Sequence, residues 1–263
     1  MTSNHSHPTV LTTVPDNFKQ LLHDTWEKQF ASWPDYADGD TFHQAALRET
    51  ERALGTFAGK VKRPSLVDLG CGSGHFLRNI RKRFRWSQLA GVDYCTQALT
   101  RADNLDVSGL PRIDYVRRDL ELPVSAEEQV RLGRFDFAAA TFVVDEIDNI
   151  EAFFATARAL LHPKGRLVCA MLDEARERTR HSLNPFPSAT GSERVIIKQV
   201  KTDPYGVDLE YYRIIRPRGE PISAATRAGL VCEFDRSSSP AELGSRLDGP
   251  SLRLLGFWNQ PAS

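Results

Sequence analysis

The sequence predicts an α/β fold, a seven-stranded and mostly parallel sheet with helices on both faces. Short apolar runs typical of buried strands recur along the chain, and segments with apolar residues at helical spacing lie between them. The run Leu66–Leu69 leads into alternate glycines over Gly70–Gly74, and helical spacing resumes over Phe76–Ile80. A glycine turn between a strand and a helix N-terminus is a place where such sheets bind nucleotides.

The composition favours one large domain with additions over two independent domains. The chain has 263 residues, 41% of them hydrophobic, which is enough to bury a full core. Its formal net charge is zero. A neutral chain gives no electrostatic reason to expect a nucleic acid or an anionic membrane as partner, so we expect neither.

Cysteine usage and the N-terminus indicate a soluble, cytoplasmic protein. The cysteines at 71, 95, 169 and 232 lack the spacing of a metal site or a disulfide framework, so we expect reduced thiols and no metal. Residues 1–13 have neither the basic nor the apolar part of a signal peptide. No apolar run is long enough to cross a bilayer.

The first 58 residues predict a disordered tail followed by two helices. Residues 1–15 are rich in Ser, Thr, His and Pro and are expected to be disordered. Residues 16–58 show helical spacing from Phe18 to Phe30, and again from Thr41 to about Gly59. An aromatic-rich break with Trp33 and Tyr36 separates the two helices.

The spacing of the glycine loop decides which nucleotide it suits. A dinucleotide loop needs its third glycine where this chain has His75, and a P-loop needs a lysine that this chain lacks. What remains is Asp68 at the strand end followed by Gly-x-Gly-x-Gly, which resembles motif I of the class I methyltransferases that use S-adenosylmethionine (SAM). A glycine turn that binds nothing is the alternative.

The resemblance implies roles for the loop. In that family the loop wraps the methionine part of SAM, and the acid helps to hold its ammonium group. The matching positions, with the cysteine between the glycines, are Asp68, Gly70, Cys71, Gly72 and Gly74.

A second strand over Leu89–Asp93 also ends in an acid. Asp93 lies at the distance beyond the glycines where an acid binds both ribose hydroxyls of an adenosine, and it matches the family's motif II acid. Tyr94 follows, where a flat side chain can lie against adenine. Thr96 is expected to cap the next helix, which runs to about Asn104.

A third strand over Ile113–Arg117 leads to Asp119 and Leu120. The resemblance implies that Asp119 accepts the adenine amino group and that Leu120 packs on the ring. A loop or helix-capping acid is the alternative for Asp119.

The fourth and fifth strands complete the resemblance. A strand over residues 135–144, a helix from about Asn149, a turn at 162–165 and a strand over 166–172 resemble this region of small-molecule methyltransferases. The predicted SAM-binding core is therefore 59–172, and Thr141 at the fourth strand's exit is assigned to the cofactor. The helices of 16–58 are expected to form a lid.

Beyond Leu172 the resemblance weakens. Residues 173–220 predict a β-hairpin insertion, with strands over 195–201 and 207–215, where the family often builds a substrate cover. Residues 221–263 predict a helix and the last two strands of the main sheet.

Candidate acceptor residues come from strand exits and from the two covering segments. The candidates for proton transfer are Asp145, Glu146 and His181, although Asp145 could cap the next helix and His181 could be an ordinary loop residue. Those for substrate contact are Trp33, Tyr211, Tyr212 and Arg213, and Tyr36 is assigned to the cofactor. Trp26 and Phe42 are interpreted as packing residues.

The predicted function is in-line methyl transfer from SAM to an oxygen, or with slightly less support a nitrogen, of a small molecule. The Asn/Asp-Pro-Pro-Tyr/Phe motif of base and glutamine methyltransferases is missing after the fourth strand. The alternatives are an RNA or protein methyltransferase and a SAM-binding regulatory protein without turnover. A monomer or a homodimer is expected.

Overall fold

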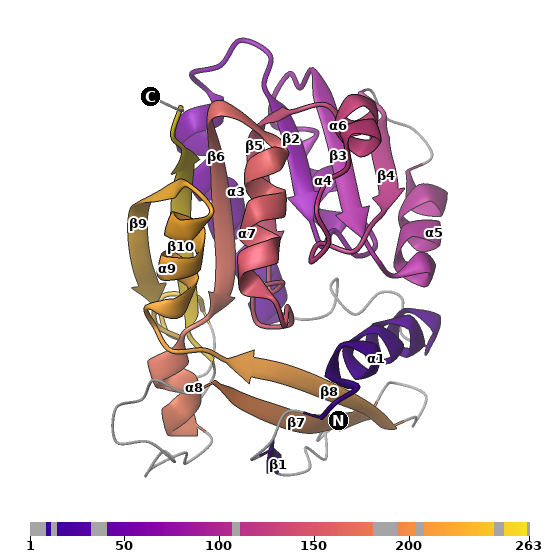
Figure 1. Cartoon of the computed structure of the whole chain (residues 1–263), viewed down its shortest axis with the longest axis vertical. Coiled ribbons are helices and arrows are strands. Elements are labelled where there is room, and N and C mark those ends of the chain that lie inside the picture. The colour runs from indigo at the N-terminus through magenta and orange to yellow at the C-terminus, as the bar shows by residue number, and fades with distance from the viewer. Residues whose placement is uncertain are drawn as a thin grey trace.

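The computed structural model describes residues 9–11, 15–32, 41–106, 111–180, 194–202, 208–244 and 250–261. Its main sheet has seven strands in the order β4-β3-β2-β5-β6-β10-β9 (Figure 1). These strands are β2 (Ser65–Leu69), β3 (Gln88–Asp93), β4 (Ile113–Arg117), β5 (Phe135–Thr141), β6 (Leu161–Leu172), β9 (Leu230–Ser238) and β10 (Leu252–Asn259). β10 runs antiparallel to both of its neighbours, and the pairs among β2 to β6 are parallel. The predicted sheet is confirmed.

Helices pack on both faces of this sheet, while α1 and α8 lie beyond its end (Figure 1). The helices of the described chain are α1 (Phe18–Ser32), α3 (Thr41–Ala58), α4 (His75–Ile80), α5 (Thr96–Leu105), α6 (Ala126–Leu132), α7 (Ile150–Ala159), α8 (Glu174–Arg180) and α9 (Glu220–Arg227). Alternate residues of each strand enter different cores, as strand geometry requires. Val67 and Leu69 of β2 pack in the core under α7 and α9, whereas Leu66 packs in the core under α3 and α4.

A second, three-stranded sheet has the order β1-β7-β8. β7 (Val195–Thr202) and β8 (Asp208–Ile215) form the antiparallel pair that the hairpin pattern predicts. β1 (Thr9–Leu11) adds to the edge of β7, with Leu11 opposite Ile196. Thr9–Leu11 falls within the tail of residues 1–15 that the composition predicts to be disordered. The structure differs because this segment pairs with the free backbone groups of an edge strand, a long-range contact that composition does not reveal.

α1 lies between the second sheet and the main sheet (Figure 1). Its apolar side packs on the second sheet, where Phe18 and Leu22 contact Ile196, Tyr212 and Ile214. We call α1 together with β1, β7 and β8 the cover. The cover is joined to the main sheet where Ile214 N donates to Asp145 O at 2.8 Å, and where the buried Arg216 donates to the carbonyl of Val144.

Several element boundaries differ from the expectation. α5 is capped by Cys95, whose Sγ accepts from Ala98 N, and not by Thr96. α6 was not predicted, although Ser125 and Glu128 form a capping box at its start. α4 ends at Ile80, where the helical spacing of the sequence also ends. β6 begins at Leu161, and the expected turn over 162–165 forms an irregularity within it: Phe135 pairs with Leu161, Phe137 pairs with Arg166, and Lys164 has a φ of 70°.

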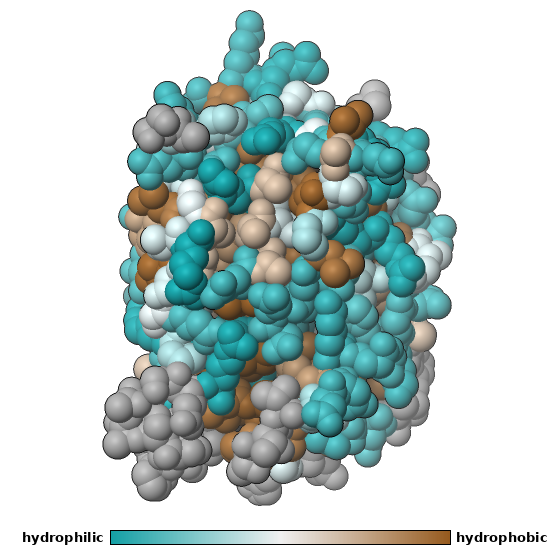
Figure 2. All heavy atoms as spheres, viewed as in Figure 1, coloured by the Kyte–Doolittle hydropathy of each residue, from teal (hydrophilic) through white to brown (hydrophobic). Residues whose placement is uncertain are grey.

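The surface in Figure 2 is largely hydrophilic, with apolar side chains scattered over it. The exposed large apolar residues of the described chain, among them Val61, Val130 and Val231, belong to separate segments. Within the described residues, no helix has both the length and the apolar character needed to span a membrane.

Candidate active site

A pocket lies at the carboxyl ends of β2 to β5, beneath α1 and the start of α3. It encloses a cavity of about 150 Å³. Strand-tip acids and the glycine loop line one side, and α1 supplies the opposite wall. The lining residues are Lys19, Leu22, His23, Trp26, Phe30, Phe42, His43, Leu47, Asp68, Gly70, Cys71, Gly72, Ser73, His75, Phe76, Asp93, Tyr94, Asp119, Leu120, Glu121, Thr141, Phe142, Val143, Glu146, Ile147 and Arg213.

The loop between β2 and α4 requires glycine at two positions for both conformation and space. Gly70 has a φ of 74° and Gly74 a φ of 73°, in the left-handed region. A Cβ on Gly70 would lie 2.3 Å from Val143, and one on Gly74 would lie 2.3 Å from the Tyr115 hydroxyl. The loop backbone therefore packs directly against its neighbours and lines the pocket without side chains in the way.

Asp93 holds this loop to the tip of β3. One carboxylate oxygen accepts from Gly72 N at 2.9 Å and the other from Cys95 N at 2.9 Å. Burial raises the pKa of Asp93, and these backbone N–H donors oppose that rise. One carboxylate thus fixes both the glycine loop and the start of α5.

Asp68 is a buried acid at the end of β2, only 4% exposed. Burial, and then the nearby Asp93, raise its pKa well above the usual carboxyl range. Two buried carboxyl groups close together form a site that a cation would stabilise, because it would offset both the desolvation and the repulsion. The chemistry of this end of the pocket therefore favours a positively charged ligand group.

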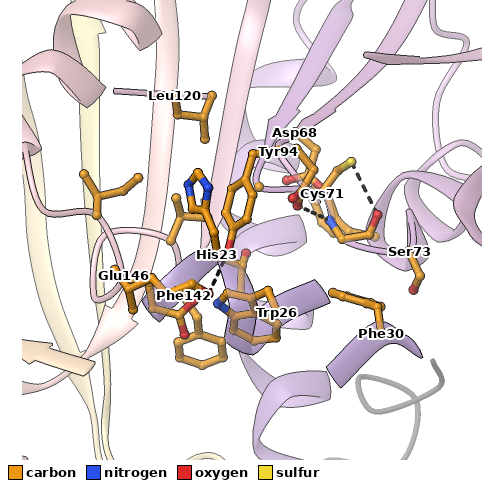
Figure 3. Close-up of a pocket in the computed structure, with 18 of the residues that line it drawn as sticks. His23, Trp26, Phe30, Asp68, Cys71, Ser73, Tyr94, Leu120, Phe142 and Glu146 are labelled. Carbon is orange, nitrogen blue, oxygen red and sulfur yellow. Dashed lines mark hydrogen bonds between the residues drawn. The ribbon is translucent and has the colours of Figure 1, made fainter. Parts of the chain in front are cut away.

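Another part of the pocket adjoins the ends of β3 and β4, where Figure 3 labels Tyr94 and Leu120. Tyr94 and Leu120 line it, and Asp119 accepts from Glu121 N at 2.9 Å. Lys19 of α1 pairs with Asp119, with Nζ 2.6 Å from Oδ2. Burial raises the pKa of Asp119, but the hydrogen bonds from Lys19 and Glu121 outweigh it, so the net pKa is lowered.

The other end of the pocket is aromatic. Phe142 stacks loosely on Phe42, with ring centroids 5.3 Å apart, and lies 5.4 Å from the ring of His43. Phe142 has a φ of 60°, a left-handed backbone that costs about 1–3 kcal/mol for a bulky residue. Glu146 and Arg213 bring charge to this aromatic end. It can therefore enclose an organic molecule and still offer polar contacts.

The profile of a family described as "Methyltransferase domain" matches residues 39–219. The chain belongs to this methyltransferase family. The predicted family, enzyme class and SAM cofactor are confirmed by this match. In the described part of the chain, no group of three or more His, Cys, Asp or Glu side chains could hold a metal ion.

Three similar proteins illustrate the range of the methyltransferase family. A malonyl-[acyl-carrier protein] O-methyltransferase from Halalkalibacterium halodurans is 29% identical over 104 residues, which is 40% of this chain and 37% of that protein. The N-methyltransferase NodS from Bradyrhizobium japonicum, solved with S-adenosylhomocysteine (SAH), gives a TM-score of 0.59 at 15% identity over 91% of this chain and 99% of its own. A SAM-bound amino pentose methyltransferase from Micromonospora echinaspora gives a TM-score of 0.56 at 16% sequence identity. That match covers 88% of this chain and 97% of the other.

The pocket brings together most of the site residues predicted from the methyltransferase motifs. Those that line it are Asp68, Gly70, Cys71, Gly72, Asp93, Tyr94, Asp119, Leu120, Thr141, Glu146 and Arg213. SAM fits these residues, since its ammonium and sulfonium are the cations that the acidic end favours, and its adenine is flat. His181, Trp33 and Tyr36 lie outside the described residues.

Four predicted residues lie away from the lining. Asp145 is buried, and its Oδ2 accepts from Leu172 N at 3.0 Å, so it joins β5 to β6 instead of facing the pocket. Tyr211 packs edge-on against Trp26, and Tyr212 packs against Phe18. Gly74, at the end of the glycine loop, lies against Tyr115 and is not part of the lining. The two tyrosines stay part of the cover because their rings fill its interior.

Sequence reasoning missed the residues that α1 contributes. Lys19, His23, Trp26 and Phe30 recur at spacings of four, three and four, which puts them on one side of a helix. That stripe is a signal in the sequence, but of its members only Trp26 is interpreted above, as a packing residue, and Lys19 and His23 are assigned no role. Phe42, also interpreted as packing, lines the pocket as well.

Proposed function

We propose that this protein transfers the methyl group of SAM to an oxygen or a nitrogen of a small molecule. One observation carries the proposal: the three strand-tip acids Asp68, Asp93 and Asp119 line the same pocket as an aromatic end that α1 and α3 enclose. The acids suit the cofactor, and the enclosed end suits an acceptor of limited size. The helical lid of residues 16–58 and the insertion of residues 173–220 would then enclose the acceptor.

The three acids have distinct roles in this proposal. Asp68 holds the ammonium of SAM, Asp93 its ribose hydroxyls, and Asp119 the adenine amino group. We call the part of the pocket that Tyr94, Asp119 and Leu120 line the adenine subsite. When bound, SAM supplies a methyl group on a positively charged sulfur. The protein's task is to align the acceptor, exclude water and accept a proton where needed.

The aromatic end provides the groups for that task. Phe142, Phe42 and Trp26 exclude water from the acceptor, and Glu146 is placed to orient it or to accept its proton. A carboxylate base suits a hydroxyl or an amine, so both acceptor atoms stay in the proposal. The name of the O-methyltransferase relative supports oxygen, and that of NodS supports nitrogen.

The test is release of SAH from the purified protein across a panel of small carboxylic acids, alcohols, phenols and amines, with mixed RNA and protein as comparison substrates. We expect turnover with a small molecule, a fall of about 10²–10⁴-fold in kcat for Glu146→Gln, and loss of SAH binding for Asp93→Ala. Turnover with RNA or protein alone would support a macromolecular methyltransferase. SAH binding without turnover on any substrate would support a regulatory protein.

The remaining expectations stay predictions. These are a cytoplasmic protein, no nucleic-acid partner, and a monomer or homodimer. His181 stays a candidate base, and Trp33 and Tyr36 stay candidate ligand contacts.

A further inference from the structure

α1 is docked on the cofactor end of the pocket by specific contacts. Lys19 Nζ lies 2.6 Å from Asp119 Oδ2 and 3.7 Å from Glu121 Oε1. Eight residues further along, the Glu27 carboxylate accepts from Thr96 N at 2.8 Å and from Gln97 N at 3.2 Å. These contacts lock the helix across the ends of β3 and β4.

Between these two anchors, the His23 ring stacks on Tyr94. The ring centroids are 3.8 Å apart and the planes are 15° from parallel. Figure 3 shows the imidazole beside the Tyr94 ring with Leu120 above it. The Tyr94 hydroxyl donates to the carbonyl of Leu22 at 3.2 Å, which fixes the ring under the helix. Burial lowers the pKa of His23, so the stacked ring is neutral at neutral pH.

The two α1 groups present the chemistry of adenine. Adenine is a flat, neutral nitrogen heterocycle with an amino group that donates hydrogen bonds. His23 supplies a flat nitrogen heterocycle against Tyr94, and Lys19 supplies N–H donors to Asp119. We infer that, in the unliganded protein, α1 fills the adenine subsite with His23 and Lys19 and so competes with SAM for it.

This inference rests on the adenine subsite proposed above, but not on the identity of the acceptor. A competitor within the chain lowers the apparent affinity for SAM by the fraction of molecules in which the subsite is open. SAM binding must therefore shift α1. Because α1 also carries Trp26 of the aromatic end, the acceptor end takes its final form only after the cofactor has bound.

Calorimetry with SAH tests the competition. Lys19→Met and His23→Ala remove the two competing groups, and Gln20→Ala is the control because Gln20 is exposed on the same helix. We expect SAH to bind each test variant about three- to tenfold more tightly than the wild type, and the control to bind like the wild type. Adenosine alone should show the same gain. Unchanged or weaker SAH binding in both test variants would overturn the inference.

A second measurement needs only the wild-type protein. If α1 must leave before SAH enters, the rate of SAH binding, followed by tryptophan fluorescence in a stopped-flow instrument, should reach a plateau as SAH concentration rises. A rate that rises linearly throughout contradicts the inference. Asp93→Ala separates the two failures: if it binds SAH like the wild type, then the cofactor site itself was misassigned.

Discussion

At the scale of single residues, the surroundings of Asp68 favour the neutral form of its carboxyl group when no cationic ligand is bound. Burial and the nearby Asp93 raise its pKa in the free protein. The ammonium of a bound ligand favours the carboxylate, so ligand binding and protonation of Asp68 oppose each other.

SAH affinity should therefore depend on pH in a defined direction. The affinity for SAH is highest above the raised pKa of Asp68 and falls as the pH drops through that pKa. The fall therefore begins at a pH above the usual range of carboxyl pKa values. We expect Asp68→Asn to bind SAH about ten- to a hundredfold more weakly at pH 8 and to lose this pH dependence. Calorimetric titrations from pH 5 to 8 check both points. A wild-type affinity independent of pH would contradict the assignment of Asp68 to the ammonium.

The convergence of the strand-tip acids could be predicted from sequence, and the contacts of the α1 residues could not. Asp68 and Asp93 end apolar runs, and parallel strands bring their carboxyl ends to one edge of the sheet, so local pattern alone places them together. Lys19 and His23 meet Asp119 and Tyr94 only through the docking of a helix from another part of the chain. No local pattern encodes that contact.

At the scale of elements, α5 begins with a cap that comes from a different helix. Glu27 of α1 accepts from the backbone N–H groups of Thr96 and Gln97, and Cys95 accepts from Ala98. A carboxylate at a helix N-terminus is stabilising because it satisfies free donors and complements the helix dipole. The sequence predicts a cap at Thr96 because threonine is a common capping residue and cysteine is not, and no residue near the helix reveals the contribution of Glu27.

Removing this remote cap should loosen two helices together. We expect Glu27→Ala to lower the free energy of unfolding by about 1 kcal/mol, or Tm by about 2–4 °C, and to speed amide hydrogen exchange in both α1 and α5. Gln20→Ala, on the exposed side of α1, should stay within about 0.5 kcal/mol of the wild type. Faster exchange in α5 alone would show that Glu27 does not hold α1 in place.

At the scale of the whole molecule, the main sheet was predictable from sequence. In the second sheet, the β7 and β8 hairpin was predictable and β1 was not. Apolar runs of a parallel sheet are continuous, and the helices between them have their own period, so the order of elements fixed the fold class. The β7 and β8 hairpin is a local pattern as well. β1 pairs with β7 across nearly 190 residues of chain, and three residues carry too little pattern to predict such a partner.

Asp145, at the junction between the two sheets, should make stability depend on pH. Burial raises its pKa to about 6, although Leu172 N, Arg213 and Arg216 favour the charged form. Because the folded pKa exceeds the unfolded value, this group favours folding below about pH 4, and that contribution is lost as the pH rises through 6. The loss is on the order of 3 kcal/mol.

Asp145→Asn keeps an oxygen that can accept from Leu172 N but cannot ionise. We expect the free energy of unfolding of this variant, relative to that of the wild type, to increase by about 1–3 kcal/mol as the pH rises from 4 to 7, as measured by denaturant titrations. Asp148→Asn, in the same loop but half-exposed, is the control and should show no such trend. Parallel pH curves for Asp145→Asn and the wild type would rule out an ionised Asp145 as a cost to folding.

The tether between the sheets has a further consequence for catalysis. Glu146 follows Asp145, whose carbonyl accepts from Ile214, and precedes Ile147, whose carbonyl accepts from Arg216. Glu146 is thus held on both sides, by β8 and by Arg216, which follows β8. If Glu146 is the base of the proposed reaction, any movement of β8 that admits or releases a substrate would also move Glu146, which would couple substrate exchange to proton transfer.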